Sequence, residues 1–134
     1  MILPAEGRHH VGPQIGANLD PSHLFWQGMD PLAVIRAVGA AVRHVHLKDT
    51  EIVTDQLAVA GVLDQRPFDD PARRAWVFRA AGGVHDRAWW TAFVEALRDV
   101  GYDGALAIEN EDASLPAEAA VEAAARFMRP IIGG

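Results

Sequence analysis

The chain has 134 residues, of which 50% are apolar and 22% are charged, and its formal net charge is −6. This length allows one globular domain, and the acidic balance without a Lys/Arg run argues against a nucleic acid as the main partner. No Cys is present, which excludes disulfides, thiolate metal ligands and cysteine nucleophiles. The first ten residues have no signal-peptide pattern, and no apolar run approaches the roughly 20 residues of a membrane span. We therefore expect a cytoplasmic protein.

The first predicted unit is a strand followed by a helix. Residues 15–20 form a short apolar stretch that Pro21 ends, and a loop follows. Asp30 is a good helix N-cap and Pro31 suits the first turn, so a helix is expected from there to Gly39, which can end it with a positive φ.

The second predicted unit contains a long irregular stretch. Residues 42–47 are partly β-branched and predict a strand. Residues 51–74 contain Gly, several Pro and several acids, and predict a long loop that includes one helical turn. A further strand is predicted at 75–79.

The last elements continue the alternation. A helix is predicted over 89–100 after the N-cap Asp86, with Trp90 on its apolar face. A strand at 104–109 and a helix over 116–128 complete the chain. Alternating strands and helices indicate an α/β fold with a parallel sheet and crossover helices.

Polar side chains lie where these strands end. Asp20 ends the first strand, His46 is near the end of the second, and Glu109 ends the last. Ligands of parallel α/β folds bind at this edge of the sheet. Asp20 and His46 are 26 residues apart, about one βα unit, and His46 and Glu109 are 63 apart, about two, which supports the strand at 75–79. Carboxylate and imidazole ligands suit Mn²⁺, Co²⁺, Zn²⁺ or Fe²⁺.

Each residue also has a plain structural interpretation. An Asp before Pro is often a turn residue, and His44, one layer deeper than His46, is more often a core histidine. Trp26 could form the wall of a sugar pocket or simply pack in the interior. Lys48 could contact an anionic oxygen of a substrate or lie in solvent. The shared position at the strand ends, rather than any one residue, favours a metal centre.

Several blocks of the sequence resemble a known family. The first block is residues 18–28, which begin Asn-Leu-Asp-Pro-Ser-His, and the second is residues 44–49, which read His-Val-His-Leu-Lys-Asp. The others are residues 83–86 and residues 100–112, which end Ile-Glu-Asn-Glu-Asp. They are similar to the sugar phosphate isomerase/epimerase family, which has the xylose isomerase-like TIM barrel. The resemblance covers residues 14–129 and implies a partial (β/α) barrel, its last three to four βα units, with residues 1–134 forming one domain that is the C-terminal half of the barrel.

The resemblance also implies roles for individual residues. Asp20, His46 and Glu109 match three of the four usual ligands of a divalent metal, which would be Mn, Co, Zn, Fe or Mg. Glu109 and His23 match catalytic positions. His23 would contact the substrate or a bound water, and His85 matches a block with a less defined role near the substrate, where Trp26 and Lys48 are further candidates. The remaining ligand of the family is a Glu on an earlier strand, which no residue here matches, Glu6 included.

The activity that the resemblance implies is aldose–ketose isomerisation or ketose epimerisation of a small sugar through a metal-bound enediolate. Because the chain matches only part of a barrel, we expect it to form a homo-oligomer or to need a chain that supplies the N-terminal half. Three alternatives stay open: a non-catalytic half-barrel fragment or partner subunit, a polyol dehydratase, and an abasic-site endonuclease on the same barrel.

Overall fold

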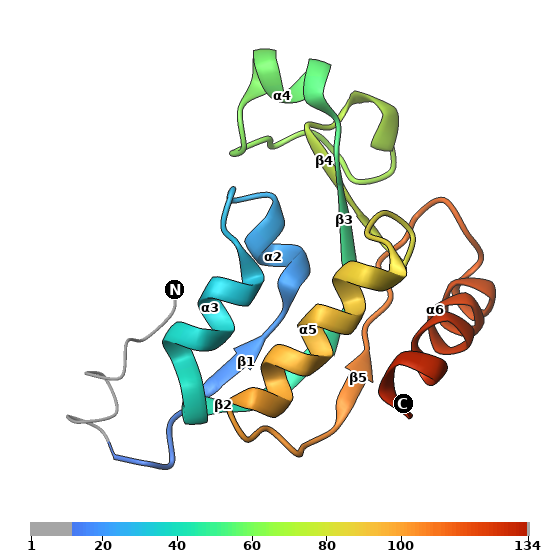
Figure 1. Cartoon of the computed structure of the whole chain (residues 1–134). Coiled ribbons are helices and arrows are strands. Elements are labelled where there is room, and N and C mark those ends of the chain that lie inside the picture. Colours follow the sequence, from blue (N-terminus) through green and yellow to red (C-terminus); the bar gives the residue numbers. More distant parts are fainter. Residues whose placement is uncertain (1–11, 134) are drawn as a thin grey trace.

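A short parallel sheet lies at the centre of the computed structural model, which describes residues 12–133 (Figure 1). Its strands are β1 (Ala17–Leu19), β2 (Val42–Leu47) and β5 (Leu106–Ile108), in the order β1-β2-β5 and with both pairs parallel. The N-terminal stretch for which no signal peptide is predicted, including Glu6, lies outside the described residues. The parallel sheet with alternating helices confirms the predicted fold class.

Helices connect the strands. The short α2 (Pro21–Phe25) and α3 (Pro31–Val38) lie between β1 and β2, α5 (Arg87–Asp99) precedes β5, and α6 (Ala117–Ile132) follows it. The predicted caps are confirmed. The Asp30 carboxylate accepts a hydrogen bond from the Leu32 N–H at 2.9 Å, and Gly39 has a φ of 56° after the last turn. The Asp86 carboxylate caps α5 in the same way, through the Trp89 N–H.

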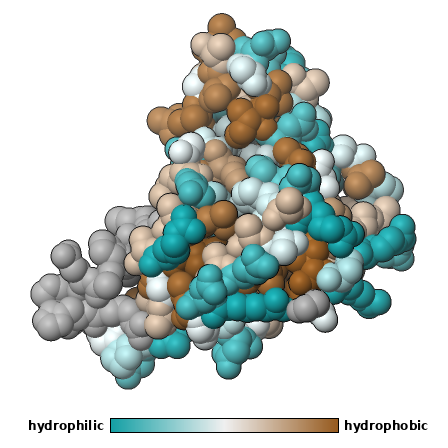
Figure 2. Space-filling model, viewed as in Figure 1, coloured by the Kyte–Doolittle hydropathy of each residue, from teal (hydrophilic) through white to brown (hydrophobic). Residues whose placement is uncertain are grey.

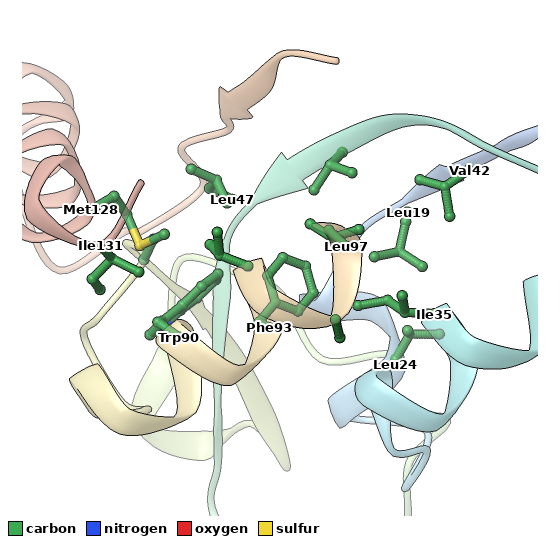
Figure 3. Close-up of a cluster of buried hydrophobic side chains, with 14 of the residues drawn as sticks. Leu19, Leu24, Ile35, Val42, Leu47, Trp90, Phe93, Leu97, Met128 and Ile131 are labelled. Carbon is green, nitrogen blue, oxygen red and sulfur yellow. The ribbon is translucent and has the colours of Figure 1, made fainter. Parts of the chain in front are cut away.

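The main core lies between one face of this sheet and helices α3, α5 and α6 (Figure 3). Ile35, Val45, Trp90 and Phe93 are 0% exposed in it, which confirms the prediction that Trp90 is a core residue. Val45 and Leu47 of β2 point into this core, and the polar residues that alternate with them point to the opposite face of the sheet. That face presents His44 and His46.

The prediction of a parallel strand at 75–79 is wrong in its placement. β4 (Trp76–Arg79) pairs antiparallel with β3 (Asp49–Ile52) in a separate two-stranded sheet, and β5 pairs directly with β2, Val45 opposite Leu106. The 63-residue separation of His46 and Glu109 therefore corresponds to one βα unit with a long insertion. A run of apolar residues predicts a strand, but it does not indicate whether the partner strand is parallel or antiparallel.

This insertion forms an arm that projects from the strand ends (Figure 1). We define the arm as residues 49–79, and it also contains α4 (Thr54–Ala60) and a 3₁₀ turn at Pro71–Arg73. The arm contains a small aromatic cluster, and Trp26, at the end of α2, packs against it by stacking on Trp76 with ring centroids 4.9 Å apart. Figure 2 shows apolar residues gathered on the outside of the arm, where Val59 is 83% exposed.

The sheet has two free edges among the described residues, because β1 and β5 each pair only with β2. Three parallel strands with their helices make part of a barrel and leave these edges for other strands. No helix within residues 12–133 combines the length and the apolar character of a membrane span.

Candidate metal centre

The three predicted ligands meet at the C-terminal ends of the parallel strands. Asp20 directly follows β1, His46 is the last residue but one of β2, and Glu109 directly follows β5. Each offers a ligand atom, and these atoms all lie within 4.8 Å of one another. The pairing of adjacent strands produces this convergence, since Glu109 extends the β2–β5 ladder by donating its N–H to the Leu47 carbonyl at 3.4 Å.

The sequence Asp-Pro-Ser holds the Asp20 carboxylate in one orientation. Pro21 begins α2, and Asp20 is its N-cap: Oδ1 accepts hydrogen bonds from the Ser22 N–H at 2.9 Å and the Ser22 hydroxyl at 2.6 Å. The other oxygen, Oδ2, is buried and has no hydrogen-bond partner. The Lys48 ammonium lies 3.2 Å from Oδ2 as an ion pair without a hydrogen bond, so this oxygen can still bind a further cation.

His46 and Glu109 face each other across the two strands. The His46 Nδ1 lies 2.6 Å from the Glu109 Oε2 and 3.8 Å from the Asp20 Oδ2. Burial raises the pKa of Glu109, but its hydrogen bond to Lys48 and the charge of that ammonium outweigh burial, and the pKa lies below its usual value. Glu109 is therefore ionised at neutral pH. The set of two carboxylate oxygens and one imidazole nitrogen suits a divalent transition metal.

Lys48 lies beneath the carboxylates. Its side chain is 0% exposed, and its ammonium is 3.2 Å from the Asp20 Oδ2 and 3.0 Å from the Glu109 Oε2. Burial lowers the pKa of Lys48, but hydrogen bonds to Glu111 and Glu109 and the charge of Asp20 outweigh it, so the pKa lies above its usual value. The group is therefore an ammonium at neutral pH and is no amine nucleophile.

A cavity of about 480 Å³ lies beside the three ligands. This volume is in the range of sites for small molecules. The polar residues that line it are Asn18, Asp20, His23, Gln27, His46 and Glu109, and apolar residues such as Leu24 and Val34 line the rest. The His23 side chain is 49% exposed and its Nε2 lies 3.6 Å from the Asp20 Oδ2, so it lies between the ligands and the cavity.

The other predicted substrate contacts lie elsewhere among the described residues. Trp26, at the end of α2, stacks on Trp76 of the arm, and Lys48 is covered by carboxylates. Neither residue lines the cavity. His85 also lies off the cavity: its Nδ1 is 2.6 Å from the buried Asp49 carboxylate, and its ring stacks on Phe25 at 3.9 Å. His44 packs edge-on against His46, with ring centroids 5.0 Å apart.

Sequence reasoning missed Glu111 as a member of this site. Its Oε1 lies 2.5 Å from the Lys48 Nζ, so it is the third carboxylate around that ammonium. Glu109 and Glu111 are two residues apart, but both follow the end of β5, so strand alternation does not apply to them and no local pattern indicated Glu111. The neighbouring Asp112 is different: it accepts hydrogen bonds from Ser114 and from the Ala80 N–H and so joins loops together.

Comparison with known proteins agrees with this architecture. The family described as Xylose isomerase-like TIM barrel matches residues 7–131. The chain belongs to this family. It is also 40% identical over 125 residues to the uncharacterized protein YfiH of Bacillus subtilis (strain 168). This match covers 93% of this chain and 40% of that relative.

A solved structure shows the same barrel fold. The crystal structure of a xylose isomerase domain protein from Planctomyces limnophilus matches with a TM-score of 0.65 and 22% identity, over 95% of this chain and 41% of that one. The chain thus spans about two fifths of the length of the proteins that it matches, and it forms a partial TIM barrel of the xylose isomerase-like family.

Proposed function

We propose that this chain supplies the metal-binding part of the active site of a sugar isomerase or epimerase. One observation carries the proposal: Asp20, His46 and Glu109 offer ligand atoms within 4.8 Å of one another, beside a cavity of about 480 Å³. The buried Asp20 Oδ2 supports the assignment, because it accepts no hydrogen bond and its contact with the Lys48 ammonium, at 3.2 Å, is an ion pair only. The three residues fit a divalent metal and would hold it together.

When bound, a divalent metal would supply Lewis acidity that polarises a carbonyl oxygen of the sugar. The residues of the chain supply the rest. Glu109 is ionised at neutral pH and is the candidate to accept a proton from the carbon next to the carbonyl. His23 extends from α2 to the cavity, where it can hold a substrate oxygen. Return of the proton to the neighbouring carbon would give isomerisation, and return to the opposite face would give epimerisation.

We further propose that other strands complete the barrel, from another copy or from a chain that supplies the N-terminal half. The free edges of β1 and β5 support this, because unpaired strand edges associate readily with other strands. Sedimentation of the isolated chain tests it. A species larger than one chain is expected if another copy completes the barrel, and an inactive monomer is expected if a different chain does. A stable monomer that turns over sugar by itself would contradict both.

Metal content tests the site directly. The chain is purified without chelator or affinity tag, and metals are measured per chain in the native protein and in the Asp20→Ala/His46→Ala double variant. We expect near-stoichiometric Mn, Co, Zn or Fe that is lost in the double variant and kept in His44→Ala, the control histidine outside the triad. Absence of metal after reconstitution would contradict the proposed centre.

Activity is then tested on a panel of aldoses and ketoses, with the chain alone and with the barrel completed. Product analysis separates isomerisation and epimerisation from loss of water, which would indicate a polyol dehydratase. The free sheet edges favour a second candidate, a partner subunit without activity of its own. Bound metal without turnover of any sugar, even in a completed barrel, would favour that candidate.

A further inference from the structure

A short segment after β5 contains two of the carboxylates at the candidate metal centre. We call residues 109–112 the ligand segment. Glu109 is a candidate ligand, and Glu111 lies 2.5 Å from the Lys48 ammonium, which is itself 3.0 Å from Glu109. The ligand segment is irregular, without the hydrogen bonds of a strand or a helix along its length. Its position therefore depends on the contacts that fix its two ends.

The first end of the ligand segment is fixed by the main sheet, through the Glu109 N–H, and the second is fixed by Asp112. The Asp112 side chain is 4% exposed and accepts hydrogen bonds from the Ala80 N–H, at 3.1 Å, and from the N–H and hydroxyl of Ser114. Burial raises the pKa of Asp112, but these hydrogen bonds and the charge of Arg79 outweigh burial, and the pKa lies below its usual value. Asp112 is therefore ionised at neutral pH.

Arg79 joins this anchor to the base of the arm. Its Nη1 lies 3.2 Å from the Asp112 Oδ1, while its Nε and Nη2 lie 2.9 Å and 2.7 Å from the Glu51 Oε2. Glu51 and Arg79 belong to the paired strands β3 and β4, and the Arg79 side chain is only 20% exposed. One guanidinium thus connects the two-stranded sheet of the arm to the ligand segment. All of these contacts form within the chain, so they do not depend on the strands that complete the barrel.

We propose that Arg79 is a positioning residue that acts through Asp112 to hold Glu109 and Glu111 at the metal centre. This inference rests on the proposed metal centre, and it gives the base of the arm a part in that site. Groups that orient metal ligands from outside the coordination shell contribute roughly 10- to 100-fold to metal affinity. Arg79 acts through a second residue, so the lower end, about tenfold, is expected.

The experiment measures the affinity for Mn²⁺ by calorimetry. The variants are Arg79→Met, Asp112→Asn, the double variant and Arg79→Lys, which keeps the charge. The matched control is Arg66→Met, which removes an ion pair of similar length, 2.6 Å to Asp64, between two residues that both belong to the arm. A general loosening of the arm would affect this control as well. Hydrogen exchange of the ligand segment, followed by mass spectrometry in the absence of metal, is the second readout.

We expect Arg79→Met and Asp112→Asn each to lower the Mn²⁺ association constant about tenfold and to speed hydrogen exchange in the ligand segment. The double variant should resemble Asp112→Asn alone, because both changes break one anchor. Arg79→Lys should recover part of the affinity, and Arg66→Met should bind Mn²⁺ as the native chain does.

Two outcomes would overturn the inference in different ways. Native affinity and native exchange in Arg79→Met would overturn the positioning role and leave the metal centre standing. A native chain that binds no Mn²⁺ would overturn the metal centre and the inference with it. If Arg79→Met does not fold, Asp112→Asn decides, since it removes the same ion pair from the other side and keeps the size of the side chain.

Discussion

Replacing Lys48 by Met should destabilise the chain strongly in the absence of metal. The substitution keeps an unbranched side chain, one atom shorter, but removes the counter-ion of three carboxylates, one of which, Asp20, is only 8% exposed. Breaking a buried ion pair costs about 3–5 kcal/mol of unfolding free energy. Glu109 and Glu111 are 37% and 46% exposed and can turn towards water, so we expect the lower end, about 3 kcal/mol.

The assay is thermal and urea unfolding followed by circular dichroism, with chelator present. A loss of about 3 kcal/mol corresponds to a fall in Tm of about 10 °C for a domain of this size. Arg36→Met is the control: its ion pair with Asp30 is 4.0 Å long and largely exposed, so it should cost less than about 1 kcal/mol. A Lys48→Met variant as stable as this control would refute the reasoning.

The pH dependence sharpens this test. The pKa of Glu109 is lowered in the folded state, so its contribution is present above the ordinary value of 4.5 and is lost as the pH falls through the folded pKa. The pKa of Lys48 is raised, so its contribution is complete below 10.5 and is lost as the pH rises through the folded pKa. The difference between native chain and variant should therefore be constant from about pH 6 to about pH 9 and shrink in acid. Parallel stability curves down to acid pH would contradict the ion-pair explanation.

Three further predictions concern other features. Asp20→Asn should abolish metal binding but keep the α2 cap through its remaining oxygen, whereas Asp20→Ala should also lose about 1 kcal/mol of unfolding free energy; equal stabilities would argue against the cap. An amine-reactive acylating reagent, with the product analysed by mass spectrometry, should leave Lys48 unmodified until urea unfolds the protein. Rapid labelling of Lys48 in the folded chain would contradict the burial of this side chain. Phe93→Ala should cost about 3–5 kcal/mol in urea unfolding, because Phe93 is 0% exposed, while Val59→Ala on the arm should change stability by less than about 0.5 kcal/mol.

Local signals were sufficient for the helices and their ends. Asp30 with Pro31 and Asp86 before its helix each provide a cap whose hydrogen bond forms within three residues, so the chain needs no distant contact to specify them. The convergence of Asp20, His46 and Glu109 was also predictable, because the C-terminal ends of parallel strands meet at one edge of a sheet.

The strand pairing and the long-range contacts of the arm were not predictable from local patterns. The apolar run at Trp76–Arg79 predicts a strand, and only tertiary structure decides that it pairs antiparallel with β3 and leaves the main sheet. That choice places Trp76 where Trp26 stacks on it. His85 is similar: its partner Asp49 is 36 residues away, so no local pattern could connect them.

By itself, the sequence determined the alternation of strands and helices, the caps, the family and the three candidate ligands, because each depends on short-range patterns or on strand ends that any parallel sheet brings together. The tertiary structure decided the strand pairing, the burial of Lys48 and its bond to Glu111, 63 residues away. These depend on long-range packing and on the desolvation of a charge, which have no counterpart in local sequence.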